Sequence, residues 1–331
     1  MRKYNVAVVG ATGLVGSTFL KVLKEYDFPI KELTLFASSR SAGKEIEYNG
    51  QKYIVKELKE GCFEGIEIAL FSAGGEISTK WAPEAEKSGA VVIDNSSAWR
   101  MAEDCALIVP EINVDDFGAC RKIVANPNCS TIQSVLPLKP LKENFGLKRV
   151  VYTTYQAVSG SGQKGKNDLI RTLNGEEPEF YPYNISKTCI PHIDSFLDNG
   201  YTKEEIKMVN ETRKILHMPN LPVSATCVRV PVLNSHAVCI MVELEKPFTL
   251  DEIRNAFASQ EGIVVLDDPK NNIYPVATVS NDNDKVYVGR IRKDLSCENG
   301  IIFYCVSDNI RKGAAANAVQ IAKKLINSDK I

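Results

Sequence analysis

A glycine-rich loop between an apolar run and a helical pattern constrains the N-terminal part of this chain most strongly. Residues 6–9 read VAVV, which is typical of a buried strand, and residues 10–16 read GATGLVG. From residue 14 to residue 26 the apolar side chains recur with the spacing of one helical face. A strand, a glycine loop and a helix in this order are typical of the first unit of a dinucleotide-binding sheet.

The glycines of this loop are spaced G-x-x-G-x-x-G rather than G-x-G-x-x-G, so a purely structural turn is the alternative to a cofactor site. Glycines allow backbone N–H groups to approach a pyrophosphate at the start of the helix. On that interpretation the candidate cofactor-binding residues are Gly10, Thr12, Gly13, Leu14, Val15 and Gly16.

The next apolar runs alternate with helical patterns. Strand-like runs occupy residues 33–36, 66–71 and 90–93, and residues 76–87 form a helical pattern between the last two. This alternation predicts an α/β fold with a Rossmann-like, doubly wound parallel sheet. Ligands of such sheets bind at the carboxyl ends of the strands.

The pattern changes after about residue 145. Strand patterns at residues 150–158, 224–230, 237–244, 286–292 and 301–306 are interrupted by helical patterns at residues 163–173, 203–216 and 250–258. They predict a second α+β domain with a mixed, largely antiparallel sheet. We expect the first domain to span residues 1–128, completed by a C-terminal helix within residues 309–331 that starts at residue 310, and the second to span residues 129–308.

Composition excludes several function classes. The 331 residues carry 40 Lys and Arg against 41 Asp and Glu, and this balance argues against a general binder of nucleic acids or membrane surfaces. No apolar run approaches the roughly 18–20 residues of a membrane span, and a strand-like run so near Met1 leaves no room for a signal peptide. Nine cysteines without a C-x-x-C pair and three histidines argue against a disulfide framework and a zinc site. We therefore expect a cytoplasmic protein with reduced cysteines and no metal.

The end of the second strand indicates which dinucleotide binds. An acidic residue about 20 positions after the glycine loop usually accepts a hydrogen bond from the free ribose 2′-hydroxyl of NAD. Residues 36–43 read FASSRSAG and contain no carboxylate. The guanidinium of Arg40, with the hydroxyls of Ser38 and Ser41, suits a 2′-phosphate instead, so we predict NADP. A solvated polar loop is the alternative.

One cysteine stands at a predicted helix start. Residues 126–131 read NPNCST, and a helical pattern follows them. A free thiol with a pKa near 8.5 is only about 3% ionised at neutral pH, but the first turn of a helix favours the thiolate. Cys129 is therefore the strongest candidate nucleophile among the nine cysteines, and Asn128 is a candidate cap.

Two polar segments of the second domain are candidates for binding. Gln156 precedes a Gly/Ser loop with Ser159 and Gly160, which is either a turn or an N–H-rich surface that faces a cofactor. Arg229 lies in a strand between valines, where its charge needs either a salt bridge or an anionic ligand.

Three further polar residues have a structural alternative to a functional role. His236 follows in a loop, where it is either structural or an acid/base near neutral pH. Glu211 and Lys214 stand three residues apart in a helical pattern, and such a pair is by default exposed on the surface.

Taken together, these segments resemble the aspartate-β-semialdehyde dehydrogenase family over nearly the whole chain. Single motifs are weak, but their order and spacing make the resemblance specific. The segments that carry it are residues 10–16 (GATGLVG), 39–43 (SRSAG), 95–100 (NSSAWR), 126–131 (NPNCST), 156–160 (QAVSG), 211–214 (ETRK), 229–232 (RVPV) with His236, and 308–315 (DNIRKGAA).

The resemblance implies NADPH-dependent reductive dephosphorylation of L-4-aspartyl phosphate to L-aspartate 4-semialdehyde, and the reverse. This step belongs to the biosynthesis of lysine, by way of diaminopimelate, and of threonine, methionine and isoleucine. By resemblance, Cys129 is similar to the nucleophile that forms a thioester, His236 to the acid/base and Gln156 to the glutamine that orients the intermediate. Arg229 is similar to the arginine that holds the substrate α-carboxylate, and Glu211 to the residue near its ammonium.

The remaining matches imply contacts with phosphate and cofactor. Arg100, Asn128 and Lys214 resemble phosphate contacts, whereas Ser159, Gly160 and Asn309 resemble positions at the nicotinamide end. Ser161 and Ala237 depart from the family pattern, in which alanine and serine are more common at these places. Both replacements are small and remove no chemically required group. The family likeness also implies a homodimer formed through the second domain, and a site between the two domains.

Other functions fit parts of the same pattern. N-acetylglutamyl-phosphate reductase and malonyl-CoA reductase are the nearest alternatives, but neither substrate has the free ammonium for which Glu211 is suited. A glyceraldehyde-phosphate-type dehydrogenase normally carries an acidic residue after the second strand. A non-catalytic NADP-sensing protein is expected to have lost at least one of Cys129, Gln156, Arg229 and His236.

Overall fold

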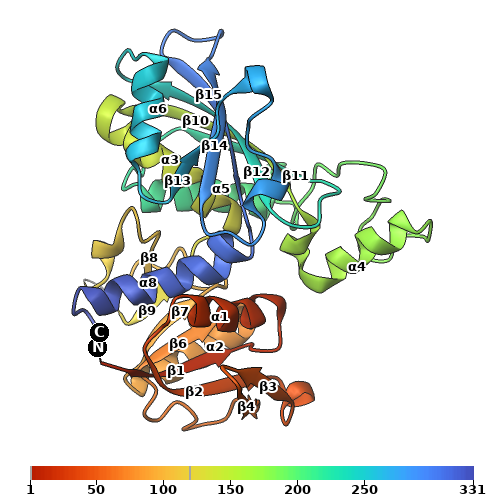
Figure 1. The fold of residues 1–331 in the computed structure, drawn as a ribbon, viewed down its shortest axis with the longest axis vertical. Helices are drawn as coiled ribbons and strands as arrows, with labels where there is room; N and C mark the ends of the chain where they lie inside the picture. The colour runs from red at the N-terminus through yellow and green to blue at the C-terminus, as the bar shows by residue number, and fades with distance from the viewer. Residues whose placement is uncertain (1, 119–120) are drawn as a thin grey trace. The chain divides into compact units, whose positions relative to one another are not determined.

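The structure, a computed structural model, describes residues 2–118 and 121–331, and the chain forms two compact units. Unit 1 comprises Met1–Pro127 and Ala314–Ile331, and unit 2 comprises Asn128–Gly313. The chain therefore leaves unit 1 once and returns to it for its last helix (Figure 1). None of the described helices is long and apolar enough to cross a membrane.

Unit 1 is built on a seven-stranded sheet in the order β5-β2-β1-β6-β7-β9-β8, in which all strand pairs are parallel. This arrangement confirms the predicted Rossmann-like sheet. The strands are β1 (Tyr4–Val9), β2 (Ile30–Ala37), β5 (Lys56–Glu57), β6 (Ile68–Phe71), β7 (Val91–Asp94), β8 (Ala106–Leu107) and β9 (Ile123–Ala125). A separate hairpin of β3 (Glu45–Tyr48) and β4 (Gln51–Ile54) was not predicted.

Helices cover both faces of this sheet. α1 (Leu14–Glu25) and α8 (Ala316–Asn327) pack on the face that carries Val6 and Val8. α2 (Gly75–Lys87) packs on the face that carries Ala7 and Val9. Because successive strand residues point to opposite faces, a strand that is covered on both sides is apolar throughout, which explains the continuous apolar run of β1.

The glycine loop lies where the strand order reverses, because β2 and β6 flank β1 on opposite sides. Gly10 has a φ of +88°, and a side chain there would collide with the carbonyl oxygen of Ser72, which follows β6. A side chain at Gly16 would collide with the carbonyl oxygen of Gly10. Both positions therefore require glycine, because the backbone packs closely there. They lie at the carboxyl ends of the strands, where ligands of such sheets bind.

Unit 2 is built on a six-stranded sheet in the order β11-β10-β12-β15-β14-β13. The three inner pairings are antiparallel and the two outer ones parallel, which confirms the predicted mixed sheet. The strands are β10 (Leu147–Gln156), β11 (Val223–Arg229), β12 (His236–Leu244), β13 (Ile263–Val265), β14 (Val286–Lys293) and β15 (Gly300–Ser307).

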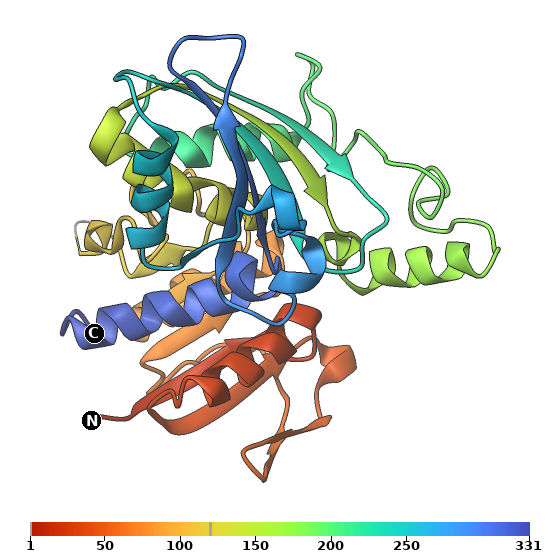
Figure 2. The same ribbon diagram turned by 45° about the horizontal axis from the view of Figure 1, so that its top comes forward.

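Three helices of unit 2 pack against this sheet. They are α3 (Cys129–Phe145), α5 (Lys203–Ile215) and α6 (Leu250–Ser259), and they contact β12, β11 and β13 respectively. α4 (Gly162–Leu173) follows the turn after β10 and lies beyond the end of the sheet (Figure 2). A short helix, α7 (Ala277–Ser280), precedes β14.

Two predicted boundaries are wrong. β10 ends at Gln156, and Val158–Ser161 form a short 3₁₀ helix where a strand was predicted. The C-terminal helix does not start at residue 310, because Arg311–Ala315 form a π-helical turn before α8. The side chain of Asp308 accepts hydrogen bonds of 2.9 and 3.0 Å from the N–H groups two and three residues later. Apolar spacing alone does not reveal such a side-chain contact or distinguish a π turn from an α-helix.

Candidate active site

Cys129 is the first residue of α3, as the sequence predicts. The side chain of Asn128 caps the helix by accepting hydrogen bonds from the N–H groups of Ser130 (2.9 Å) and Thr131 (3.3 Å). A Cβ at Gly313 would lie 2.9 Å from the Cβ of Cys129, so only glycine allows the chain after β15 to pack here. The half-buried thiol therefore lies in the first helical turn, where the helix dipole stabilises negative charge.

Gln156, the last residue of β10, is held against the start of α3. Its Nε2 donates to the hydroxyl of Ser130 (2.6 Å) and to Oε1 of Glu204 on α5 (3.2 Å). The side chain is buried. These contacts bring the predicted orienting amide and the predicted nucleophile to the same helix N-terminus.

Ala157 links His236 to Arg229. Its N–H donates to Nδ1 of His236 (3.0 Å), and its carbonyl accepts a hydrogen bond from Nη1 of Arg229 (2.6 Å). A Cβ at Gly160 would lie 2.9 Å from Nη1 of Arg229 and 3.1 Å from Nε2 of His236. The turn after β10 therefore faces both side chains, and the predicted residues Gln156, Gly160, Arg229 and His236 come together around it.

The hydrogen bond from Ala157 fixes the tautomer of His236. Because Nδ1 accepts a hydrogen bond, the proton of the neutral ring is on Nε2. Nε2 is buried and has no hydrogen-bond partner among the described residues. A buried donor without a partner is unusual in proteins and suits a bound molecule. Burial, together with the nearby charge of Arg229, lowers the pKa of His236 well below its ordinary value of 6.5.

This lowered pKa predicts how stability depends on pH. Below pH 6.5 the unfolded chain protonates His236 whereas the native chain keeps it neutral, so the free energy of unfolding falls as the pH falls. One such group contributes at most about 1.4 kcal/mol per pH unit. In urea unfolding between about pH 7.5 and about pH 5, the His236→Gln variant is expected to lose stability less steeply than the wild type. Identical slopes would contradict a buried, neutral His236.

Arg229 is buried, with 4% of its surface exposed. Its Nη1 donates to a backbone carbonyl, and no carboxylate among the described residues forms an ion pair with it, so the salt-bridge alternative is wrong. A buried cation without a protein counter-ion is costly unless a ligand supplies the negative charge. The guanidinium is therefore placed to bind an anionic group.

Glu211 is 1% exposed, so the expectation of an exposed pair with Lys214 is wrong for this residue. Its Oε2 accepts a hydrogen bond from the backbone N–H of Asn128 (2.6 Å). Lys214 lies one turn later on α5 and is half-buried. The i,i+3 spacing could not reveal this burial, because it depends on the packing of α5 against α3 and β11.

Hydrogen bonds of Ser159 and Asn309 connect three loops of unit 2. The hydroxyl of Ser159 donates to Oδ1 of Asn309 (3.0 Å), which also accepts the N–H of Ser235 (2.9 Å). The turn after β10, the loop before β12 and the loop after β15 therefore converge. Ser159 and Asn309 are two of the three positions predicted for the nicotinamide end of a cofactor, and that role stays a prediction.

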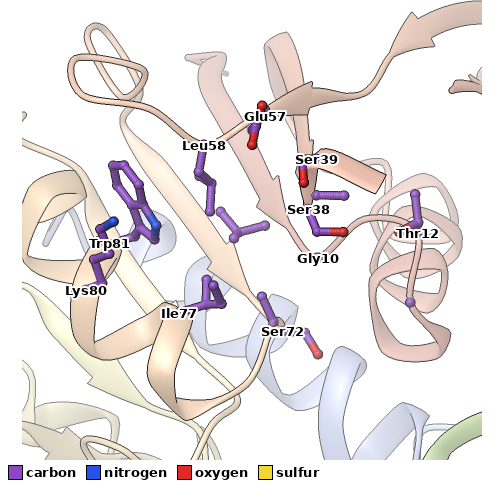
Figure 3. A pocket seen from close by; sticks show the side chains of 14 residues that line it. Gly10, Thr12, Ser38, Ser39, Glu57, Leu58, Ser72, Ile77, Lys80 and Trp81 are labelled. Atoms are coloured by element: carbon purple, nitrogen blue, oxygen red, sulfur yellow. The ribbon is translucent and has the colours of Figure 1, made fainter. Parts of the chain in front are cut away.

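Unit 1 has a pocket of about 480 Å³ at the carboxyl ends of its strands (Figure 3). Among the predicted cofactor residues, it is lined by Gly10, Thr12, Gly13 and Ser38, but not by Leu14, Val15, Gly16, Arg40 and Ser41. Gly13 caps α1 without a side-chain hydrogen bond, so the first N–H groups of the helix have no side-chain acceptor at the cap and suit an anionic group. The lining residues that were not predicted are Val9, Ala37, Ser39, Glu57, Leu58, Ser72, Ala73, Ile77, Lys80 and Trp81.

Glu57 brings a carboxylate to this pocket. The segment of residues 36–43 has none, but β5 pairs with the end of β2, so that Glu57 lies beside Ala37. Figure 3 shows its carboxylate on the same side of the pocket as Ser38 and Ser39. No sequence signal indicates this, because β5 is only two residues long and its place in the sheet is not set by chain order. Arg40, in contrast, is exposed in the short 3₁₀ helix Ser39–Ser41.

Arg100 lies in unit 1 and is 8% exposed. Its guanidinium donates from Nε to the carbonyl of Asn126 (3.0 Å) and from Nη2 to the carbonyl of Asn95 (2.9 Å). Its role in phosphate binding stays a prediction. Within residues 2–118 and 121–331, no three His, Cys, Asp or Glu side chains gather in a way that could hold a metal ion.

Comparisons with known proteins show which protein family the chain is similar to. The model of the semialdehyde dehydrogenase NAD binding domain matches residues 5–119, and that of the semialdehyde dehydrogenase dimerisation domain matches residues 138–312. The aspartate-semialdehyde dehydrogenase of Aquifex aeolicus is 53% identical over 333 residues, with 98% of each chain covered. The structure of aspartate semialdehyde dehydrogenase II complexed with ASA from Vibrio cholerae has a TM-score of 0.95 and 45% identity, with 99% of each chain covered. The structure of aspartate semialdehyde dehydrogenase with NADP from Candida albicans has a TM-score of 0.79 and 26% identity, with 100% of each chain covered.

Proposed function

Because this chain belongs to the aspartate-semialdehyde dehydrogenase family, we propose that it catalyses the reversible, NADPH-dependent reduction of L-4-aspartyl phosphate to L-aspartate 4-semialdehyde and phosphate. The observation that carries this proposal is the buried guanidinium of Arg229, which has no carboxylate partner among the described residues. It lies against the turn that follows β10, and so does the buried Nε2 of His236. An anionic substrate supplies a negative charge for Arg229 and a hydrogen-bond acceptor for Nε2 of His236. The Vibrio cholerae relative in complex with ASA supports the same assignment.

The proposed reaction runs through a thioester on Cys129. The thiolate attacks the acyl carbon, a C–S bond forms, and the C–O bond to phosphate breaks, so that phosphate leaves. The thioester is needed because a free carboxylate is too poor a hydride acceptor. NADPH supplies the hydride. As the hydride adds, the Nε2–H group of His236 donates a hydrogen bond to the developing oxyanion of the thiohemiacetal and so acts as its acid/base partner. The proton stays with His236 as the C–S bond breaks, the aldehyde leaves and the Cys129 thiolate is regenerated.

The substrate contacts follow from the buried charges of unit 2. We propose that Arg229 binds the α-carboxylate, that Glu211 binds the ammonium, and that Gln156 orients the intermediate. A buried Glu211 favours a substrate with a free ammonium over an N-acetylated substrate or a CoA thioester. The residues proposed to contact phosphate are Arg100, Asn128 and Lys214, and those proposed for the nicotinamide end are Ser159, Gly160 and Asn309.

The experiment that tests this function is a comparison of substrates with purified protein. NADPH formation is followed with aspartate semialdehyde, phosphate and NADP⁺, and in parallel with N-acetylglutamate semialdehyde and phosphate, and with malonate semialdehyde and CoA. We expect turnover with the first set only. Turnover with either other set, and none with aspartate semialdehyde, would assign the chain to a different reductase of the same fold.

We propose unit 1 as the NADP-binding domain and unit 2 as the catalytic and dimerisation domain. The start of α1 suits the pyrophosphate because Gly13 leaves its N–H groups without a side-chain cap. Ser38, Arg40 and Ser41 are proposed to bind the 2′-phosphate. The Candida albicans relative with NADP supports this choice.

Arg40→Ala tests the choice of cofactor. Loss of a charge-assisted hydrogen bond of about 1.5–3 kcal/mol is expected to raise KM for NADP⁺ by roughly 10- to 150-fold. KM for NAD⁺ is expected to stay nearly unchanged, because NAD⁺ has no 2′-phosphate. Steady-state kinetics with both cofactors measure this difference. Equal increases for both would contradict a 2′-phosphate contact and would point to a general effect on the pocket.

We also propose a homodimer formed through the unit 2 sheet. The face of β10, β12 and β15 opposite α3 carries two adjacent rows of half-exposed side chains, and a mostly apolar surface of this kind suits a second copy of the chain. The rows are Val151, Met241 and Ile302, and Thr153, Cys239 and Tyr304. The match to a dimerisation domain over residues 138–312 supports this surface. The described cysteines are all free, which fits our proposal that the enzyme works in the reducing cytoplasm.

A further inference from the structure

We propose that Glu204 is a positioning residue that determines which way the side-chain amides of Asn128 and Gln156 face. Glu204 lies on α5, and its side chain is 8% exposed. Its Oε1 accepts hydrogen bonds from Nδ2 of Asn128 (2.9 Å) and from Nε2 of Gln156 (3.2 Å). One buried oxygen therefore contacts both amides beside the nucleophile. The inference rests on the proposed function, in which these amides contact substrate.

The direction of both amides follows from the chemistry of a carboxylate. An ionised carboxylate accepts hydrogen bonds and donates none, so each amide must turn its NH₂ group towards Glu204. Asn128 then presents Oδ1 to the N–H groups of Ser130 and Thr131, and this contact caps the helix of Cys129. Gln156 likewise turns its carbonyl oxygen away from Glu204. A neutral amide at position 204 can donate as well as accept, and so it would not impose one orientation.

Lys207 provides the counter-charge that a buried carboxylate needs. Its Nζ lies 3.2 Å from Oε2 of Glu204 and 2.7 Å from Oδ2 of Asp194. Oε1 of Glu204 therefore accepts hydrogen bonds from the two amides, while Oε2 forms the ion pair with Lys207. This division of the two oxygens explains why a carboxylate, rather than another acceptor, is suited to this position.

Glu205 provides a matched control on the same helix. It is also buried, but its Oε1 accepts the N–H of Cys227 (3.0 Å) and its Oε2 accepts the N–H of Thr202 (2.8 Å) in a capping box. Neither contact involves Asn128 or Gln156. Glu205→Gln is therefore expected to lower stability without a specific effect on the nucleophile.

The test compares Glu204→Gln with Glu205→Gln by three measurements: melting temperature, steady-state kinetics, and the rate of Cys129 alkylation by iodoacetamide as a function of pH. We expect both variants to melt at lower temperature. Only Glu204→Gln should reduce kcat for aspartate semialdehyde by roughly 10- to 100-fold, with KM for NADP⁺ unchanged, because a misplacement of about 1 Å costs that much in rate. Only Glu204→Gln should also move the alkylation profile to higher pH, because the helix cap is no longer held in one orientation.

Two results would overturn the proposal: a wild-type kcat and alkylation profile in Glu204→Gln, or equal changes in both variants. If Glu204→Gln does not fold, Glu204→Asp replaces it, with Glu205→Asp as its control. Aspartate keeps the charge but withdraws the carboxylate by one methylene, so the same changes in the same direction are expected, and their absence would overturn the proposal. Alkylation requires no turnover, so this measurement separates a failure of this inference from a failure of the proposed function.

Discussion

Cys129→Ser is expected to abolish nearly all activity, with a loss of several orders of magnitude, while the fold and the binding of NADPH persist. A serine hydroxyl is essentially never ionised at neutral pH, whereas a thiol is ionised to a few per cent even without activation. The change in volume is small, and the helix cap from Asn128 uses only backbone N–H groups of Ser130 and Thr131. Kinetics, circular dichroism and NADPH titration measure the three properties separately.

The matched control for this variant is Cys297→Ser. Cys297 is a half-buried thiol before β15, at the end of that strand opposite Ser307 and the loop of Asn309. It should keep wild-type activity. An alkylating agent should inactivate the wild type, and aspartate semialdehyde should protect it. Substantial turnover by Cys129→Ser would exclude the thioester route.

Arg229→Lys is expected to reduce kcat/KM for aspartate semialdehyde by about 100-fold or more. A planar guanidinium holds a carboxylate through two parallel hydrogen bonds, whereas an ammonium is a compact charge that does not fix its orientation. Orientation decides the rate here, because the reacting carbonyl must meet both the thiolate and the hydride donor, and about 1 Å of misplacement costs about 100-fold. Lysine also loses the geometry of the contact from Nη1 to the carbonyl of Ala157.

The control measurements separate substrate binding from structural damage. KM for NADP⁺ and the melting temperature of Arg229→Lys should stay close to those of the wild type. Arg149→Lys changes an exposed arginine of β10, far along the strand from Gln156, and should leave all parameters unchanged. A destabilised Arg229→Lys protein with unaltered substrate kinetics would show that Arg229 does not bind the α-carboxylate of the substrate.

Features that depend on neighbours in the sequence were predictable. The loop at residues 10–16 needs glycines because its backbone packs closely on itself and on the end of β6, and these glycines stand next to an apolar strand. The start of α3 at Cys129 was predictable because Asn128 is a strong capping residue before an apolar helical pattern. Both inferences rest on residues close together in the chain.

Features that depend on the order of strands and the packing of helices were not predictable. Glu57 reaches the pocket because β5 adds to the edge of β2, and chain order does not determine that place. Glu204 and Glu211 look like ordinary surface residues of a polar helix, yet the packing of α5 buries both against the start of α3. Charged residues are rarely buried without a partner, and the partners of these two, among them Asn128, Gln156 and Lys207, come from contacts that the sequence pattern does not show.

If Cys129 carries the acyl group during the reaction, acid-quenched mass spectrometry can detect that group on the enzyme. The enzyme is mixed with aspartate semialdehyde and NADP⁺ without phosphate, quenched within the first turnover, and digested. We predict a burst of one NADPH per chain and one β-aspartyl group on the peptide that contains Cys129, which disappears when phosphate is added before the quench. NADPH formation that requires phosphate from the first turnover, with no acyl group on that peptide, would rule out a thioester on Cys129.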